Sequence, residues 1–173
     1  SISLPGGASD YILSEANVDL KLGSADFTVE YWIYFNSAAT QKAAAVFGNG
    51  ATAYDALFGW VETTNAFVLY LSSNGGAWDI ASSVAIIPAS ISTSQWYHVA
   101  ITRNGSTFKT FCNGNQTSTF TSSSSIYQSA NQFCLGRYAT SYNINAYIDD
   151  FRFTKGVSLY NYNFTPPAAP FPN

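Results

Sequence analysis

Short runs of aromatic and aliphatic residues, each closed by a turn dipeptide, recur along most of the 173-residue chain. The clearest case is residues 95–120, QWYHVAITRNGSTFKTFCNGNQTSTF, where Asn104-Gly105 and Asn113-Gly114 separate three such runs. Asn-Gly pairs favour tight hairpin turns because both residues tolerate a positive φ. We therefore predict a three-stranded antiparallel meander over residues 95–120.

Residues 26–36, DFTVEYWIYFN, alternate strictly, as expected for a strand. One face is apolar and the other is amphipathic, which predicts a strand covered on both sides. Aromatic residues make up 17% of the chain, and they fit pleated strands well. No 3.6-residue periodicity persists anywhere. The sequence therefore predicts an all-β protein with one domain over residues 1–160, followed by a Pro-rich extension over residues 161–173.

The chain carries few charges and no cluster of them. Its formal net charge is −3, and 10% of its residues are charged, against about 25% in a typical soluble domain. Nucleic-acid binding needs a basic stripe that neutralises phosphates, and the sequence has none. No stretch reaches the roughly 18 consecutive apolar residues of a transmembrane helix. We expect neither a nucleic-acid partner nor a membrane span.

Cys112 and Cys134 are the two cysteines of the chain. One pair is not a disulfide framework. The two could form a bridge if their strands are neighbours, and two buried free thiols fit equally well. The sequence leaves both alternatives open.

Three segments resemble strands of concanavalin A-like, laminin G-like domains. DFTVEYWIYF (26–35) is similar to that family's strand F-T-(I/V)-E-x-W-(I/V), and QWYHVAITRNGSTFKTFCNG (95–114) is similar to its hairpin W-x-H-V-A-x-T-R-x-G…Y-x-N-G. YIDDFRFTKG (147–156) resembles its closing strand, I-D-(D/E)-(F/L/V)-R. The three motifs occur in the family's order. The resemblance implies a two-sheet antiparallel jelly-roll sandwich.

The resemblance also implies that the closing strand lies beside the N-terminal segment. Carboxylates there would accept N–H bonds from loop backbone, and an arginine would offset their charge. Strict alternation places Asp149 on the side of Tyr147 and Phe151, and it places Asp150 with Arg152 on the other side. We expect Asp149 to be partly buried and hydrogen-bonded. We expect Asp150 and Arg152 to pair or to meet partners on adjacent strands.

Calcium is the functional alternative for these carboxylates. Domains of the family that the chain resembles often hold Ca²⁺ with one or two aspartates and backbone carbonyls. Calcium takes six to eight oxygens at about 2.3–2.6 Å. The candidate ligands are Asp149 or Asp150 together with Asp10 of the GGASDY loop. The sequence contains no dense D-x-D-x-D-G loop, so the calcium site is an expectation that rests on the resemblance.

The carboxylates of the chain do not form the pattern of a glycosidase. Glycoside hydrolysis needs two of them flanking the sugar, about 5–9 Å apart. Related jelly-roll glucanases carry E-x-D-x-x-E or E-x-D-x-E on one strand, and neither run occurs here. Glu30 stands alone and is interpreted as structural. The single histidine, His98, occupies the family's W-x-H-V position, which implies a core residue bonded to backbone, and no G-x-S-x-G elbow is present. We predict a domain that is not an enzyme.

Three loops carry residues that suit a sugar ligand, which is held by aromatic faces and by polar side chains on loops of a rigid scaffold. These loops are residues 48–60, 72–80 and 136–147. For Trp60 and Trp78 singly, a core or edge-covering role is favoured over a role in ligand binding. The candidate ligand-binding residues are Tyr54, Asp55, Trp78, Tyr138, Tyr142, Asn143 and Asn145.

The ending TKGVSLYNYNFTPPAAPFP (154–172) resembles the ending common in laminin G-like domains of phage virion and tail proteins. The Pro-rich extension would pack on the sandwich, as Phe164 and Phe171 favour, or on a neighbouring subunit. We therefore expect a lectin-like recognition module at a phage virion surface, or extracellular, whose partner is a glycan or another virion protein. Such a module could be oligomeric within an assembly.

Two further alternatives stay open. One is a structural decoration or assembly protein of a virion, such as a tail, fibre or capsid component, with no sugar ligand. The other is an extracellular adhesion module, which would give a role to the Asn-x-Ser/Thr sequons at Asn104, Asn115 and Asn163. An uncovered sheet edge or apolar patch would favour assembly, whereas an aromatic cluster open to solvent would favour a lectin.

Overall fold

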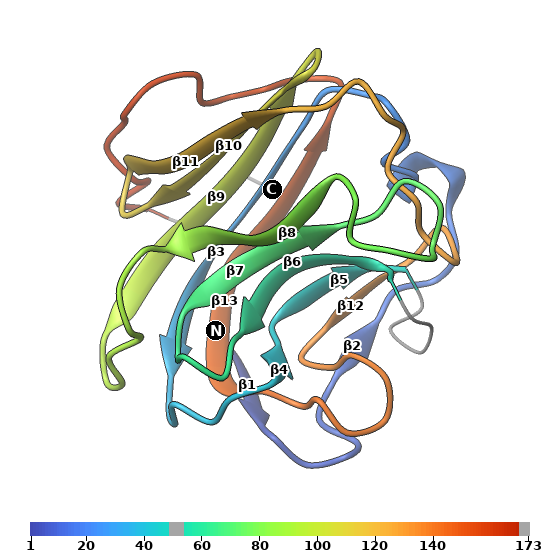
Figure 1. Ribbon diagram of the computed structural model, residues 1–173. Coiled ribbons are helices and arrows are strands. Elements are labelled where there is room, and N and C mark those ends of the chain that lie inside the picture. Colours follow the sequence, from blue (N-terminus) through green and yellow to red (C-terminus); the bar gives the residue numbers. More distant parts are fainter. Residues whose placement is uncertain (49–53, 170–173) are drawn as a thin grey trace.

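The computed structural model describes residues 1–48 and 54–169. Within these residues, thirteen strands form two antiparallel sheets that stack face to face (Figure 1). The helical content is one 3₁₀ turn, η1 (Val18–Leu20). The predicted all-β sandwich of two antiparallel sheets is confirmed.

The six-stranded sheet of the described chain is built around the central strand of the first motif. Its order is β1 (Ile2–Pro5), β13 (Asn145–Lys155), β3 (Phe27–Phe35), β9 (Trp96–Asn104), β10 (Thr107–Cys112) and β11 (Asn115–Thr121).

The second sheet lies in front in Figure 1 and holds seven of the described strands. Its order is β2 (Ile12–Leu13), β12 (Phe133–Leu135), β5 (Ala45–Phe47), β6 (Ala56–Val61), β7 (Phe67–Leu71) and β8 (Ala81–Ile87), with β4 (Lys42–Ala43) also paired to β6.

The two strongest sequence signals correspond to observed elements. β9, β10 and β11 form the predicted meander. The second turn is at Asn113-Gly114 as predicted, whereas the first is at Gly105-Ser106, one residue later than predicted, because Asn104 still pairs with Thr107. β3 is buried on its inner face and partly covered on its outer face. Its strict alternation therefore reflects a central strand between two covering layers.

The core between the sheets is packed with aromatic rings in edge-to-face contacts. Phe58 of β6 lies at its centre, with ring centroids 5.6 Å from Phe27 and 5.2 Å from Phe47. Such pairs stabilise a core beyond the area they bury. The hydroxyl of Tyr31 donates to the backbone carbonyl of Phe58 and so joins the two sheets. Burial raises the pKa of this phenol, which stays neutral.

A β-bulge in β6 turns Trp60 outward. The register between β6 and β7 shifts between Phe58 and Trp60, with Gly59 as the extra residue at φ 135°. Phe58 packs in the core between the sheets, and Trp60 packs with the cluster on the other face. Strict alternation would have put Phe58 and Trp60 on one face. A bulge changes this because one extra residue inverts the side-chain pattern beyond it.

A second bulge, in β13, corrects the alternation predicted for the closing strand. The register with β3 shifts between Asp149 and Arg152, and Asp150 has φ 46°. Asp149 and Arg152 face outward opposite Trp32 and Glu30, while Phe151 packs against the core. Asp149 therefore does not share a face with Phe151, because the extra residue separates them.

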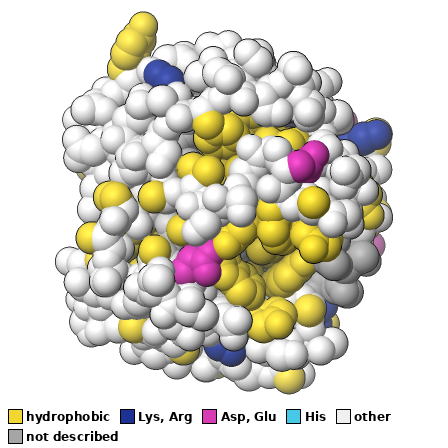
Figure 2. Space-filling model, in the orientation of Figure 1, with side chains coloured by type: hydrophobic (Ala, Val, Ile, Leu, Met, Phe, Trp, Pro, Cys, Tyr) yellow, Lys and Arg dark blue, Asp and Glu magenta, His cyan; other side chains and the backbone are white. Residues whose placement is uncertain are grey.

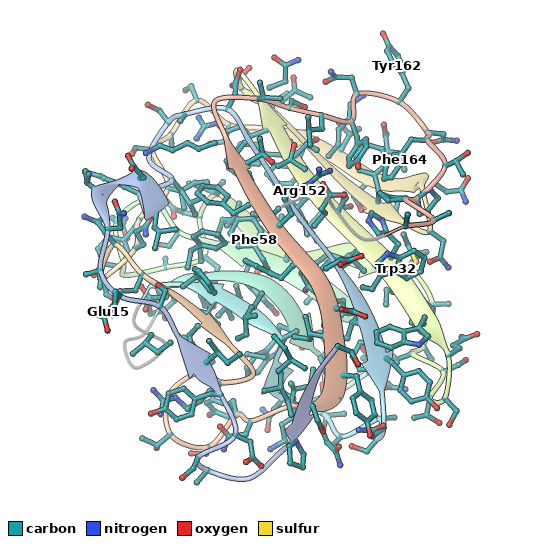
Figure 3. All side chains as sticks on the ribbon, turned by 180° about the vertical axis from the view of Figure 1, so that it is seen from behind. Glu15, Trp32, Phe58, Arg152, Tyr162 and Phe164 are labelled. Carbon is teal, nitrogen blue, oxygen red and sulfur yellow. The ribbon has the colours of Figure 1, made fainter. Side chains whose placement is uncertain are left out.

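The segment after β13 crosses the outer face of the six-stranded sheet. Figure 3 shows Phe164 turned toward the sheet and Tyr162 turned to solvent. The Phe164 amide donates to the carbonyl of Gly114 at 2.9 Å, and the Phe164 ring stacks on Tyr160 with centroids 3.6 Å apart. The described part of the extension thus lies on its own sandwich. Phe171 lies outside the described residues.

Cys112 and Cys134 are both free thiols. They lie in β10 and β12, which belong to different sheets. The alternative of a bridge between neighbouring strands is therefore not realised. Among the described residues, no helix is long and apolar enough to span a membrane.

Candidate aromatic binding site

A shallow hollow of about 320 Å³ lies on the outer face of the seven-stranded sheet. Figure 2 views this face and shows a hollowed apolar area near its middle. We call this site the aromatic hollow. Its lining residues, six of them aromatic, are Tyr54, Leu57, Trp60, Tyr70, Trp78, Tyr138 and Tyr142.

Two strands form the floor of the aromatic hollow. Leu57 and Trp60 come from β6, and Tyr70 comes from the facing position of β7, where it pairs with Leu57. These side chains point away from the core because the opposite residues of both strands fill it. The β6 bulge adds Trp60 to the floor. The sheet therefore supplies a rigid base, on which three loops place the other rings.

One wall of the hollow comes from the loop between β12 and β13. Tyr142 meets Trp60 edge to face, with centroids 5.1 Å apart. Tyr138 stacks with Tyr142 at 6.1 Å and meets Trp60 at the same distance. The hydroxyl of Tyr138 accepts the backbone N–H of Tyr54 at 2.9 Å, which links this wall to the opposite loop. Burial raises the pKa of Tyr138, and the carboxylate of Asp55 adds to the effect.

The other wall comes from the loops before β6 and before β8. Trp78 lies between Tyr54, with centroids 4.9 Å apart, and Tyr70, at 5.1 Å. The hydroxyl of Tyr70 donates to Glu62, which also accepts from Ser83 at 3.1 Å. Burial raises the pKa of Tyr70, and its bond to Glu62 raises it further. Both phenols are therefore neutral hydrogen-bonding groups at neutral pH.

Four of the seven predicted ligand-binding residues meet in the aromatic hollow: Tyr54, Trp78, Tyr138 and Tyr142. Asn143 does not line it. Its side chain is buried, its residue bridges to Ala43 of β4, and its Oδ1 has no partner among the described residues. Asn145 lies in β13 of the other sheet, where its Oδ1 accepts from Asn36 at 3.0 Å.

Asp55 also lies outside the lining of the hollow. Its carboxylate is fully buried and accepts from the backbone N–H of Ser129 at 2.6 Å and from the Ser129 hydroxyl at 2.8 Å. A buried carboxylate is stable only with such partners. The geometry gives Asp55 a structural task, holding the loop before β6 against residues 127–129. Residues 49–53 of the candidate loop lie outside the described residues.

The sequence prediction missed Tyr70 and Leu57, and it favoured a core or edge-covering role for Trp60. Tyr70 and Leu57 sit inside strand-like runs, where a single sequence does not tell which face is covered. The one available signal was Gly59, because a glycine inside a strand pattern often marks a bulge. A bulge there predicts that Trp60 changes face.

The three carboxylates considered for calcium do not lie together. Asp10 caps its own loop by accepting the Gly7 N–H at 2.6 Å. Asp149 lies 3.2 Å from the backbone nitrogen of Ser1 and accepts the Asp150 N–H at 3.1 Å. Strand β1 separates the two places. Over residues 1–48 and 54–169, no three His, Cys, Asp or Glu side chains form a group that could hold a metal. The arrangement of these three carboxylates does not fit a calcium ion, and calcium binding by the chain stays a prediction.

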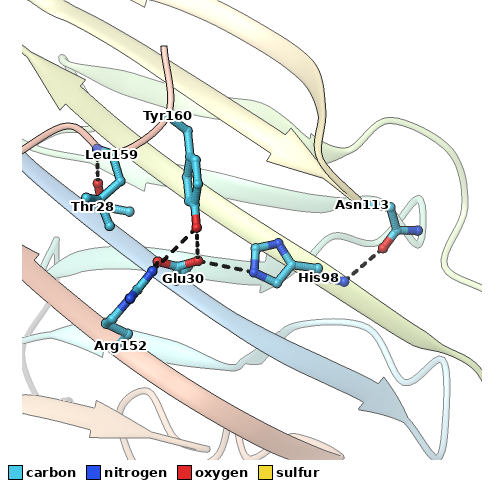
Figure 4. Close-up of polar contacts among 7 residues, drawn as sticks. All are labelled: Thr28, Glu30, His98, Asn113, Arg152, Leu159 and Tyr160. Carbon is cyan, nitrogen blue, oxygen red and sulfur yellow. Dashed lines mark hydrogen bonds and ion pairs between the residues drawn. The ribbon is translucent and has the colours of Figure 1, made fainter. Parts of the chain in front are cut away.

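A separate polar network lies under the C-terminal segment (Figure 4). Glu30 is fully buried. Its Oε1 accepts a hydrogen bond from Arg152, and its Oε2 accepts one from the hydroxyl of Tyr160 at 2.8 Å. His98 Nε2 lies 3.3 Å from the same Oε2. The expectation that the His98 ring is bonded to backbone is therefore wrong, because the carboxylate is its neighbour. Its backbone N–H, in contrast, donates to Asn113 Oδ1 at 2.9 Å.

The Glu30 carboxylate is held ionised by its neighbours. Burial alone would raise its pKa, but hydrogen bonds from His98, Arg152 and Tyr160 outweigh burial and lower it. Burial and the bond to Glu30 raise the pKa of Tyr160 to about 12. The C-terminal segment covers this network through Tyr160. Glu30 therefore has a structural role, which agrees with its interpretation from the sequence.

Comparisons with known proteins agree with the fold. A family model described as the concanavalin A-like lectin/glucanases superfamily matches residues 6–158, whereas no curated protein matches the sequence. Domain 4 of AbnA, an extracellular arabinanase of Geobacillus stearothermophilus, is similar with a TM-score of 0.60 and 19% identity, over 78% of this chain and 62% of that one.

Two other solved structures are similar at the same level. The SAP-like pentraxin of Limulus polyphemus has a TM-score of 0.58 and 16% identity, over 87% of this chain and 73% of that one. Botulinum neurotoxin type C has a TM-score of 0.60 and 17% identity, over 87% of this chain and 38% of that one. Structural similarity at these sequence identities shows a shared fold. The family model, in addition, matches most of the chain. The chain belongs to the concanavalin A-like lectin/glucanase superfamily.

Proposed function

We propose that this chain is a non-catalytic recognition module that binds a glycan in the aromatic hollow. The observation that carries the proposal is the gathering of six partly exposed aromatic side chains in one hollow, built from two strands and three loops. A hollow lined by rings with a few convergent polar groups is the usual form of a small-ligand site.

The chemistry of the hollow suits a sugar. The C–H face of a sugar ring packs on an aromatic face, while its hydroxyls need donors and acceptors at the edge. Glu62 and the hydroxyls of Tyr70 and Tyr138 supply acceptors there. Among the described residues, the indole N–H groups of Trp60 and Trp78 have no partner and are free to donate. A ligand would therefore find both stacking surfaces and hydrogen bonds.

The absence of catalysis is part of the proposal. The residues that line the hollow include no carboxylate, whereas glycoside hydrolysis needs two facing the scissile bond. Glu62 at the rim is engaged by Tyr70 and Ser83, and Asp55 is buried against Ser129. Domain 4 of the similar arabinanase was solved with arabinotriose, which supports a sugar as the class of ligand for this chain as well.

The test is a glycan array probed with the purified chain, run with calcium and again with a chelator. Trp60→Ala and Tyr142→Ala should each weaken binding at least about tenfold, since ring anchors in such sites carry more than 1 kcal/mol each. Tyr162→Ala is the matched control, because that ring is 82% exposed and remote from the hollow. Equal losses in all three variants, or no binding by the folded chain, would refute the proposal. A loss with the chelator alone would establish a calcium requirement.

We further propose that the module works at a phage virion surface or in a related extracellular assembly. The support is the resemblance of residues 154–172 to the endings of phage virion and tail domains. Mass spectrometry of purified particles from a producing host would test this location. Failure to find the chain in particles would remove the virion role and leave the glycan site untouched.

An alternative role as a structural decoration has its own support at the edge of the seven-stranded sheet. There, Ile12 and Leu13 of β2 are 38% and 40% exposed. Over the described residues, β2 pairs only with β12, so its other edge is free to meet a neighbour. Light scattering of the wild type and of Leu13→Lys would decide, because an assembly through this edge is lost in the variant.

A further inference from the structure

A second set of exposed aromatic rings lies on the opposite face of the molecule. Tyr147 of β13, Tyr34 of β3 and Trp96 of β9 are directly opposite one another across three neighbouring strands. Their ring centroids are 5.9 and 5.5 Å apart in that order. All three face outward, because Ile33 and Phe35 on either side of Tyr34 fill the core. We call this row the aromatic ladder.

The aromatic ladder is open to solvent. Trp96 is 39% exposed and Tyr147 is 37% exposed. Neighbouring strands are about 4.8 Å apart, so the outer two rings lie roughly 10 Å from each other, which suits a short oligosaccharide better than a single sugar. A contiguous row of exposed rings differs from the scattered apolar residues found on every surface.

Two hollows border the ladder, and Trp96 lines both. One, of about 370 Å³, is lined by Ser1, Tyr34, Asn36, Trp96 and Tyr147. The other, of about 420 Å³, is lined by Trp32, Trp96, Asp149, Asp150, Pro167, Ala168 and Ala169. The C-terminal segment therefore forms one wall of the second hollow.

The polar groups beside the ladder define the ligand class. Asp149 and Asp150 offer carboxylate oxygens, and Asn36 offers an amide. Both the Ser1 nitrogen and the Asp150 N–H contact Oδ1 of Asp149. Oδ2 of Asp149 is therefore available to a ligand. No lysine or arginine is among the residues that line these two hollows. Carboxylates accept bonds from sugar hydroxyls and repel anionic sugars, so the charge favours a neutral glycan.

We propose that the aromatic ladder is a second glycan site, which binds a neutral oligosaccharide with Trp96 as its anchor. The aromatic hollow lies on the outer face of one sheet and the ladder on the outer face of the other. One domain would then hold two separate glycan chains and link them. Such bivalence raises the avidity for a surface that carries many copies of a glycan.

The four tryptophans of the chain make a direct test feasible. Trp60 and Trp78 line the aromatic hollow, and Trp32 and Trp96 line the hollow beside the ladder. In the 5-fluorotryptophan protein, each ¹⁹F signal would be assigned by a Trp→Phe variant. The folded protein would then be titrated with cellohexaose, maltohexaose, xylohexaose, mannohexaose and chitohexaose.

A saturable shift of the Trp96 and Trp32 signals with at least one of these probes is expected. Tyr34→Ala should weaken that response at least tenfold, and Tyr162→Ala should leave it unchanged. A response confined to Trp60 and Trp78 would overturn the second site and keep the proposed function. A response confined to Trp96 and Trp32 would support the second site and overturn the proposed function of the aromatic hollow. No response from any tryptophan to any of the five probes would count against both.

Linking of two chains has its own readout. The wild type should make a suspension of beads coated with the responding oligosaccharide cluster, as measured by turbidity. Trp96→Ala should abolish the clustering and still shift the Trp60 and Trp78 signals. Undiminished clustering by folded Trp96→Ala would contradict the bivalent model.

Discussion

Arg152 of β13 donates two hydrogen bonds to a single oxygen of Glu30 in β3, from Nε at 2.8 Å and from Nη2 at 2.5 Å. The other oxygen of Glu30 accepts from the hydroxyl of Tyr160 in the C-terminal segment. The buried carboxylate of β3 therefore links this central strand by hydrogen bonds to the closing strand β13 and to the C-terminal segment.

Arg152→Met should destabilise the fold by about 3 kcal/mol, because it leaves a buried carboxylate without its main partner. The double variant Glu30→Met with Arg152→Met should lose less, since it buries no unpaired charge. Urea denaturation midpoints of the wild type and both variants measure the difference. A double variant that is less stable than the single one would contradict this account.

The lowered pKa of Glu30 predicts the pH dependence of stability. A carboxyl whose pKa is lower in the folded than in the unfolded chain stabilises the fold above the unfolded value of 4.5. This contribution is lost as the pH falls from about 4.5 through the folded pKa. We expect the free energy of unfolding to fall less steeply below pH 4.5 in Glu30→Gln than in the wild type. Parallel curves would show that other carboxylates dominate.

Gly59→Ala should disrupt the β6 bulge. Gly59 has φ 135°, and a Cβ there would clash with the ring of Phe67 and with the hydroxyl oxygen of Tyr31. We expect a loss of about 3 kcal/mol, from backbone strain and overpacking together, and a changed fluorescence of the neighbouring Trp60. Gly105→Ala is the control, because it has φ 57° and no atom within 4 Å of its Cβ. It should cost about 1 kcal/mol.

Gly114→Ala should displace the C-terminal segment. A Cβ on Gly114 would overlap the carbonyl oxygen of Phe164, so the backbone bond between these residues would be lost. Gly156→Ala has a similar φ, 86° against 78°, but meets nothing within 4 Å. Limited proteolysis should cut the tail of the Gly114 variant at least tenfold faster than that of the Gly156 variant. Equal cleavage rates would argue against tail docking at Gly114.

Cys112 should react slowly with iodoacetamide in the folded protein. Burial raises the pKa of its thiol to about 11, from an ordinary value of 9.0. At pH 8 the reactive thiolate is therefore about a hundredfold rarer than for an ordinary cysteine. Mass spectrometry should show two free thiols after denaturation without reductant, and slow labelling before it. A bridged pair would contradict the structure.

Much of the fold followed from local patterns. The alternation of residues 27–35 and the Asn-Gly turns at 104–105 and 113–114 predicted four strands of the six-stranded sheet, because side chains in a strand alternate and a short hairpin turn fixes the register of its strands. Four of the seven predicted sugar-binding residues also meet in one hollow. Tyr138 and Tyr142 were predicted because their loop shows no apolar periodicity that would indicate a core role.

Amino-acid sequence alone thus determined an all-β sandwich, its central strands and several rings of its site. Tertiary packing decided which face some side chains occupy. The bulge at Gly59 turns Trp60 into the aromatic hollow, and the bulge at Asp150 turns Arg152 toward Glu30. One extra residue inverts a period of two. Whether a strand takes the extra residue depends on neighbours in the other sheet, such as Tyr31 of β3, which comes close to Gly59 only once the two sheets have packed.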